Sequence, residues 1–182
     1  VAISKEFNIT LRFQFTPMPV LTKKIINMSY MWQTPRDLDR YLAPKDIVLL
    51  SAGMSHRAFG GLEAGYKQLE YYSEYASEIS RRCASVTYRT TTFRRKPSKL
   101  YVQRVGNPIF HVLYYFRELF LFHGRDDIIL LDSSNAFLAF LEEAQNGIHP
   151  PSLHVELMVD WWIQKVMDKL KHNVAISNLY RP

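Results

Sequence analysis

The sequence predicts an α/β fold, a three-layer αβα sandwich in which helices cover both faces of a mostly parallel sheet. Strand-like apolar segments alternate with longer stretches of helical spacing four times along the chain, and this alternation is typical of parallel sheets. The composition, 47% hydrophobic and 22% charged among 182 residues, is that of a folded globular protein. We expect a single domain over residues 1–175 with a tail at 176–182. Because Val1 leads almost directly into a strand, the chain reads as an N-terminally truncated domain.

The first half of the chain supplies two strands and one short helix. Residues 7–16 alternate apolar and polar side chains and predict a strand, which the prolines after it end. Thr34 and Pro35 are the residue types that start a helix. Residues 46–51 form a continuous apolar run, as expected for a central parallel strand covered on both sides.

Two helices with a strand between them are predicted next. Residues 62–82 place apolar side chains at steps of three and four, which indicates an amphipathic helix. Residues 85–93 are rich in β-branched and aromatic residues and predict a strand. Asn107 and Pro108 then start a strongly apolar helix that Gly124 closes.

The last elements are a buried strand, a short helix and a long terminal helix. Residues 128–131 predict the strand, and Asp132 with the serines after it can cap a helix through Leu141. The terminal helix is expected to turn one apolar face inward, formed by Val155, Val159, Trp162, Val166 and Leu170.

Ligands of open α/β sheets bind at the loops that follow the carboxyl ends of the strands. Several polar residues occupy these predicted loops: Thr16, Gly53, Ser55, His56, Asp132, Asn146 and His149. The sequence contains neither G-x-G-x-x-G nor G-x-x-x-x-G-K-[ST], which disfavours nucleotide binding of those types.

His149 is the strongest candidate for a general base, because imidazole titrates near neutral pH. It lies in a turn stiffened by Pro150 and Pro151. The spacing Asn146-x-x-His149 before an amphipathic helix resembles the Asp-x-x-His block of SGNH hydrolases, in which the acid orients the histidine and the histidine activates a serine.

The resemblance extends to the PC-esterase branch, and most to the neurexophilin and PC-esterase domain (NXPE) proteins. Residues 146–151 are similar to the closing segment of that family, and residues 46–51 leading into Gly53 are similar to its oxyanion-hole block. The resemblance implies an SGNH/flavodoxin-like fold and an acyl-ester hydrolase or O-acetyltransferase acting on a carbohydrate, with no metal or organic cofactor.

Under this resemblance, His149 is the proton shuttle and Asn146 orients it. Gly53, Ser55, His56 and the backbone N–H of Thr16 then stabilise the oxyanion or bind substrate. The resemblance also implies a location in the secretory pathway, in the Golgi lumen or outside the cell, which two glycosylation triplets starting at Asn8 and Asn27 permit.

Three departures from the family pattern bear on activity. No Gly-Asp-Ser segment occurs, so we expect the nucleophile to lie upstream of Val1 or to be lost. Thr16 stands near the position of a family glycine. Asn146 replaces the usual Asp and cannot stabilise an imidazolium by charge; Asp132 can supply that charge, or it can cap a helix or form a salt bridge at its strand end.

The departures keep a second function open, a non-catalytic glycan- or protein-binding domain on the same fold. A nucleotide-dependent transferase is the weakest alternative, because no phosphate loop is present.

The net charge of +6 is concentrated between Arg81 and Arg104. The basic segment indicates either a solvated helix end and loop or a site for an anionic glycan, whereas nucleic acid is not expected without a reading-head motif. The apolar stretch 109–122 is too short to cross a bilayer. Cys83, the sole cysteine, allows neither an internal disulfide nor a Cys-based zinc site.

Overall fold

The computed structural model describes residues 2–4, 6, 9–11, 42–52, 55–91, 108–138 and 152–179. It divides into two compact units, 1–41 and 42–182. In the first unit, β1 (Ala2–Ser4) pairs with β2 (Ile9–Leu11) in antiparallel register. A strand therefore forms within the predicted span 7–16. The expectation that it joins the parallel sheet is wrong for the described residues, because β2 pairs with β1 in a separate two-stranded sheet.

The second unit is built on a three-stranded parallel sheet. Its strands are β3 (Ile47–Leu50), β4 (Ser85–Arg89) and β5 (Ile129–Leu131), and they lie side by side in the order β3-β4-β5. Leu50 lies opposite Tyr88, and Arg89 lies opposite Leu131. A helix connects each pair of neighbouring strands, as parallel pairing requires. The predicted α/β class is confirmed. The prediction that residues 46–51 form a central strand covered on both sides is wrong for the described residues, because β3 stands at one end of the strand order and its Ile47 and Leu49 are 46% and 43% exposed.

In the described part of the chain, four helices accompany the sheet: α1 (Ser55–Ser80), α2 (Pro108–Phe122), α3 (Ser133–Leu138) and α4 (Ser152–Leu179). The start and end of α2 agree with the prediction, and Gly124 after it has a φ of +74°, a left-handed conformation that glycine adopts readily. The prediction for α1 needs a correction, because this helix begins at Ser55 and not near residue 62. Ser55 and His56 therefore belong to the first turn of a helix and not to a strand-end loop.

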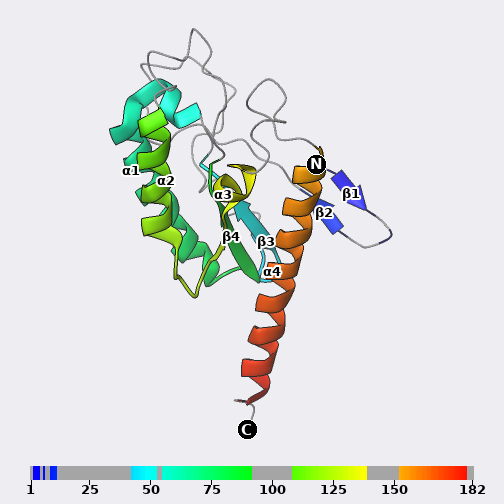
Figure 1. Cartoon of the computed structure of the whole chain (residues 1–182). Coiled ribbons are helices and arrows are strands. Elements are labelled where there is room, and N and C mark those ends of the chain that lie inside the picture. Colours follow the sequence, from blue (N-terminus) through cyan, green and yellow to red (C-terminus); the bar gives the residue numbers. More distant parts are fainter. Residues whose placement is uncertain are drawn as a thin grey trace. The chain divides into compact units, whose positions relative to one another are not determined.

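Side-chain alternation along the strands assigns the two faces of the sheet. Val86 and Tyr88 point into the core that α1 and α2 cover, and the ring of Tyr88 stacks on Phe122 with centroids 3.7 Å apart. Thr87 and Arg89 point the other way: the Thr87 hydroxyl accepts a hydrogen bond from α4, and Arg89 lines a pocket under that helix. Figure 1 shows α1 and α2 on one side of the strands and α4 on the other, an arrangement compatible with three αβα layers.

The inward face of α4 differs from the predicted one in its first turns, whereas Trp162, Val166 and Leu170 are covered as predicted. Val155 and Val159 are 46% and 43% exposed, whereas His154 is only 2% exposed. The covered stripe passes through His154, Met158, Trp162 and Val166 at steps of four. Steps of three and four both keep side chains on one face of a helix. The spacing therefore predicted the helix, but it was compatible with two rotations about the helix axis that differ by about one residue.

Candidate functional site

The carboxyl ends of β4 and β5 are tied together by a hydrogen-bonded network. The Ser133 hydroxyl donates to the Thr90 carbonyl oxygen (2.6 Å), and the Ser134 N–H donates to the Thr90 hydroxyl oxygen (2.9 Å). The Ser134 hydroxyl donates in turn to the carbonyl oxygen of Thr91. Both serine hydroxyl hydrogens are therefore donated to backbone carbonyls, which indicates a structural role for these two side chains.

Asp132 is the predicted site residue whose surroundings are described. Its Oδ1 accepts hydrogen bonds from the Thr90 hydroxyl (3.1 Å) and from the Asn135 N–H (3.2 Å), so it caps the first turn of α3. Its Oδ2 accepts from the Tyr115 hydroxyl at 2.6 Å. Burial, together with this hydrogen bond, raises the pKa of Tyr115 well above its ordinary value. Asp132 thus performs the capping role, and its predicted pairing with His149 stays a prediction.

A second carboxylate, Glu118 of α2, is fully buried behind the end of β4. Its Oε1 accepts from the Tyr88 hydroxyl (2.8 Å), the Thr91 N–H (3.0 Å) and the Thr91 hydroxyl (2.9 Å). A buried carboxylate is tolerated when several donors satisfy it. Glu118 therefore anchors α2 to the segment that leaves β4, and together with the serines it fixes the geometry of the carboxyl edge.

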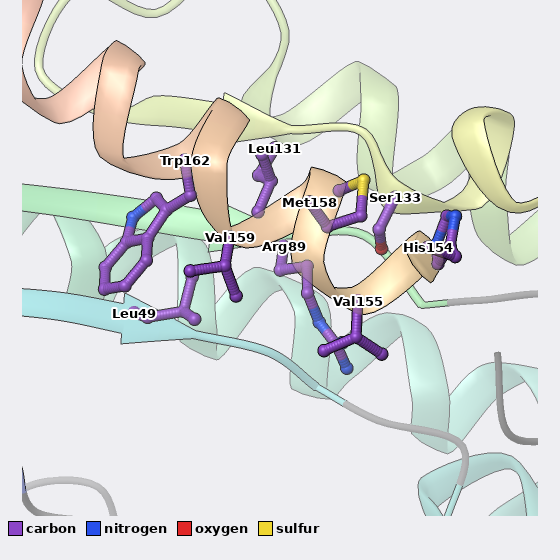
Figure 2. A pocket seen from close by; sticks show the side chains of 9 residues that line it. All are labelled: Leu49, Arg89, Leu131, Ser133, His154, Val155, Met158, Val159 and Trp162. Atoms are coloured by element: carbon purple, nitrogen blue, oxygen red, sulfur yellow. The ribbon is translucent and has the colours of Figure 1, made fainter. Parts of the chain in front are cut away.

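A pocket of about 110 Å³ lies next to this edge, between α4 and the sheet. Figure 2 shows its lining side chains, with Trp162 and His154 toward opposite ends and Arg89 reaching beneath the first turns of α4. Its apolar lining is Leu49, Leu131, Val155, Met158, Val159 and Trp162. The indole N–H of Trp162 donates to the Thr87 hydroxyl oxygen at 2.9 Å, which holds the ring in place.

The polar part of the lining consists of Arg89, Ser133 and His154. Burial lowers the pKa of the Arg89 guanidinium, which nevertheless keeps its charge at neutral pH because arginine titrates far above that range. Burial, and to a smaller extent the charge of Arg89, lowers the pKa of His154. The imidazole is therefore neutral near pH 7, and Arg89 gives the pocket a positive charge.

Most of the residues expected to form the active site lie outside the described residues: Thr16, Gly53, Asn146 and His149. For Ser55 and His56 the structure describes the backbone, in the first turn of α1, and not the side chains. The predicted approach of His149 to Gly53 stays a prediction. The chain positions that flank it are described, because β3 ends at Leu50 and α4 begins at Ser152.

Sequence reasoning missed Arg89 and His154 as lining residues. Side chains alternate between the two faces of a strand, so the predicted strand 85–93 places Arg89 on the same face as Thr87. That placement could have distinguished Arg89 from the other arginines and lysines of the basic segment. For His154, the signal was the stripe at steps of four that continues through Met158, Trp162 and Val166.

Comparison with known proteins adds no family assignment, since neither a family model, nor a curated protein, nor a solved structure matches this chain. Among the described helices, none has the length and apolarity to span a membrane. Within the same part of the chain, no cluster of three or more His, Cys, Asp or Glu side chains is arranged to hold a metal ion. The fold and site thus define an α/β protein with a cationic, mainly apolar pocket at the carboxyl edge of a parallel sheet.

Proposed function

We propose that this chain is the C-terminal part of an SGNH-type, PC-esterase-like domain that carries out acyl-ester hydrolysis or O-acetyl transfer on a carbohydrate, in the secretory pathway. In this proposal a serine from a segment outside this sequence attacks the acyl group, and His149 takes and returns its proton. Asn146 orients His149, and Gly53 with Ser55 or His56 stabilises the tetrahedral oxyanion. The chemistry needs no metal or organic cofactor.

The observation that carries the proposal is the pocket at the carboxyl edge of the parallel β3-β4-β5 sheet. In open α/β sheets this edge is where ligands bind. The first turn of α4 lines the pocket through His154, and His149 precedes the helix start, Ser152, by three residues. Three residues of backbone span at most about 11 Å, which supports a catalytic histidine near the same edge.

The rigid network around Asp132 and Glu118 also supports a site here. A catalytic constellation has to be held in place by residues whose own positions are fixed by packing and hydrogen bonds. Asp132 accepts three hydrogen bonds and Glu118 is fully buried, so the carboxyl ends of β4 and β5 are held in place. Loops that leave these strand ends therefore start from fixed positions.

The proposal is tested on the full-length protein with a serine-directed fluorophosphonate and with acetyl release from an acetylated oligosaccharide. The wild-type protein should react with the probe and release acetate. His149→Ala should lower acetate release about a hundredfold or more, the usual contribution of a general base, with its circular dichroism unchanged. His172→Ala, which replaces an exposed histidine on helix α4, is the matched control and should keep full activity. No labelling and no acetate release by the folded wild-type protein would reject the proposal.

A second function, a non-catalytic glycan- or protein-binding domain, is favoured by one specific observation. The hydroxyls of Ser133 and Ser134 and the Asp132 carboxylate, all at the carboxyl end of β5, are engaged in structural hydrogen bonds. This function predicts that His149→Ala leaves glycan or partner binding unchanged. Loss of acetyl release on that substitution, with folding preserved, would contradict it.

A further inference from the structure

Arg89 is a half-buried cation without a matching anion in the described part of the chain. No carboxylate there forms an ion pair with it. Burial lowers the pKa of Arg89, and the charges of Tyr88 and Glu118 offset this only in part. The oxygens of Glu118 are occupied by Tyr88 and Thr91 on the opposite side of β4. Withdrawing a guanidinium from water is costly unless an anion compensates it. A bound anion would supply that compensation.

The surroundings of Arg89 restrict what kind of anion fits. Six of the nine lining side chains are apolar, and the hydroxyl hydrogen of Ser133 is already donated to Thr90. His154 is held neutral by burial and by the nearby Arg89 charge. One cation in an apolar pocket suits a singly charged group with an apolar tail. A phosphate or sulfate would bring more oxygens than the lining can satisfy.

The size of the pocket limits the tail. Its volume of about 110 Å³ is somewhat smaller than the ~150 Å³ apolar cavity that accepts benzene. A chain of a few carbon atoms therefore fits against Leu131, Met158 and Trp162, which lie along the lining in Figure 2.

We infer that the pocket between α4 and the sheet binds a short-chain aliphatic carboxylate, whose carboxylate pairs with the Arg89 guanidinium and whose tail contacts Leu131, Met158 and Trp162. Arginine forms two parallel hydrogen bonds to a carboxylate, which gives geometric selectivity as well as attraction. The inference goes beyond the proposed acyl-ester chemistry and does not require it, since the site binds its ligand whether or not His149 acts as a base.

The test uses the whole chain and sodium butanoate as the probe. The indole N–H of Trp162 reports binding by NMR, with its signal assigned through Trp162→Phe. Butanoate should shift this signal saturably, with a Kd of about 1 mM or tighter. Butanamide has the same shape without the charge and should bind the wild-type protein about tenfold more weakly, and inorganic phosphate should not displace butanoate. Equal binding of butanamide, displacement by phosphate, or no saturable shift with butanoate would each overturn the inference.

Variants locate the charge that binds the carboxylate. Arg89→Gln should weaken butanoate binding about tenfold or more, equivalent to roughly 1.4 kcal/mol, while Arg81→Gln, an exposed arginine after α1, should leave it unchanged. If Arg89→Gln fails to fold, Met158→Trp, which fills the pocket, should abolish binding. Unchanged affinity in the folded variant would refute the site. Butanoate binding by a protein without esterase activity rejects only the proposed function, whereas acetyl release without butanoate binding rejects only this site.

Discussion

The hydroxyl of Tyr88 donates a 2.8 Å hydrogen bond to Oε1 of Glu118, and both side chains are fully buried. Tyr88 lies on the central strand β4 and Glu118 on helix α2, so the bond crosses the layer between sheet and helices. Burial, the charge of Glu118 and this hydrogen bond together raise the pKa of Tyr88 well above its ordinary value. The phenol therefore stays protonated, and remains a hydrogen-bond donor, at neutral pH.

Removing the carboxylate of Glu118 should destabilise the fold strongly. Glu118→Ala leaves the Tyr88 hydroxyl and the Thr91 N–H and hydroxyl without their acceptor and opens a cavity, so we expect a loss of about 3 kcal/mol or more in the free energy of unfolding. Glu118→Gln keeps an oxygen for most of these donors and should cost about 1 kcal/mol. Urea unfolding measures both, and an equal loss for Ala and Gln would contradict the assigned acceptor role.

Gly124 should be intolerant of side chains for a conformational reason alone. Its φ is +74°, and a Cβ added there would meet nothing within 4 Å. Gly124→Ala should therefore cost about 1 kcal/mol through left-handed backbone strain and not through a clash. Gly124→Asn should cost less, because asparagine tolerates this conformation better. Thermal unfolding of both variants tests the order, and Asn at least as destabilising as Ala would show that strain is not the cause.

The ion pair between Arg125 and Asp127 should make part of the stability depend on acidic pH. Two hydrogen bonds join them, at 2.9 and 2.5 Å, and these lower the pKa of Asp127 below its ordinary value of 3.8. The folded state then binds the Asp127 proton less well than the unfolded chain does. The ion pair's contribution to the free energy of unfolding is therefore complete well above pH 3.8 and is lost as pH falls through the lowered pKa.

Asp127 is 40% exposed, so solvent screening limits its contribution to less than about 1 kcal/mol. The stability difference between the wild-type protein and Asp127→Asn should shrink as pH is lowered from 7 to 3. Asp126→Asn, one residue earlier and exposed, is the control and should show no such trend. If the difference in unfolding free energy between the wild-type protein and Asp127→Asn did not change with pH, the lowered pKa of Asp127 would be wrong.

His154 should also make the stability depend on pH, in a range above that of Asp127. The cause here is burial of the imidazole and not an ion pair. Burial, then the charge of Arg89, lowers its pKa from the ordinary 6.5. The unfolded chain therefore binds a proton that the folded protein resists, and stability falls as pH drops below 6.5 until the folded pKa is passed. The slope is at most about 1.4 kcal/mol per pH unit.

Replacing this imidazole removes the linked proton. His154→Gln should flatten the change in urea midpoint between pH 7.5 and 5, and His123→Gln, an exposed histidine after α2, should leave it unaltered. If the urea midpoint of His154→Gln changed with pH as much as that of the wild-type protein, the pH dependence would have to come from another group.

How far the sequence determined the structure differs between elements. The run at 46–51, the β-branched segment from Ser85 and the apolar run ending at Leu131 became β3, β4 and β5, because apolar and β-branched residues in short segments favour strands. Burial on both faces was predicted for residues 46–51 and did not follow, since Ile47 and Leu49 of β3 are exposed. Pro108 and Gly124 bounded α2 correctly, because each has a restricted or unusual backbone preference at a helix end. Ser55 and His56 were expected in a loop, since no apolar stripe extends that far toward the start of α1.

Local sequence by itself determined the α/β class, the parallel strands and the helix ends, since these depend on periodicity and on backbone preferences that operate within a few residues. Only the tertiary structure decided that β2 pairs with β1, that α4 turns His154 inward, and that Arg89, His154 and Trp162 line one pocket. Pairing partners, helix rotation and the meeting of side chains from distant segments depend on packing across the whole domain, and no short stretch of sequence contains that information.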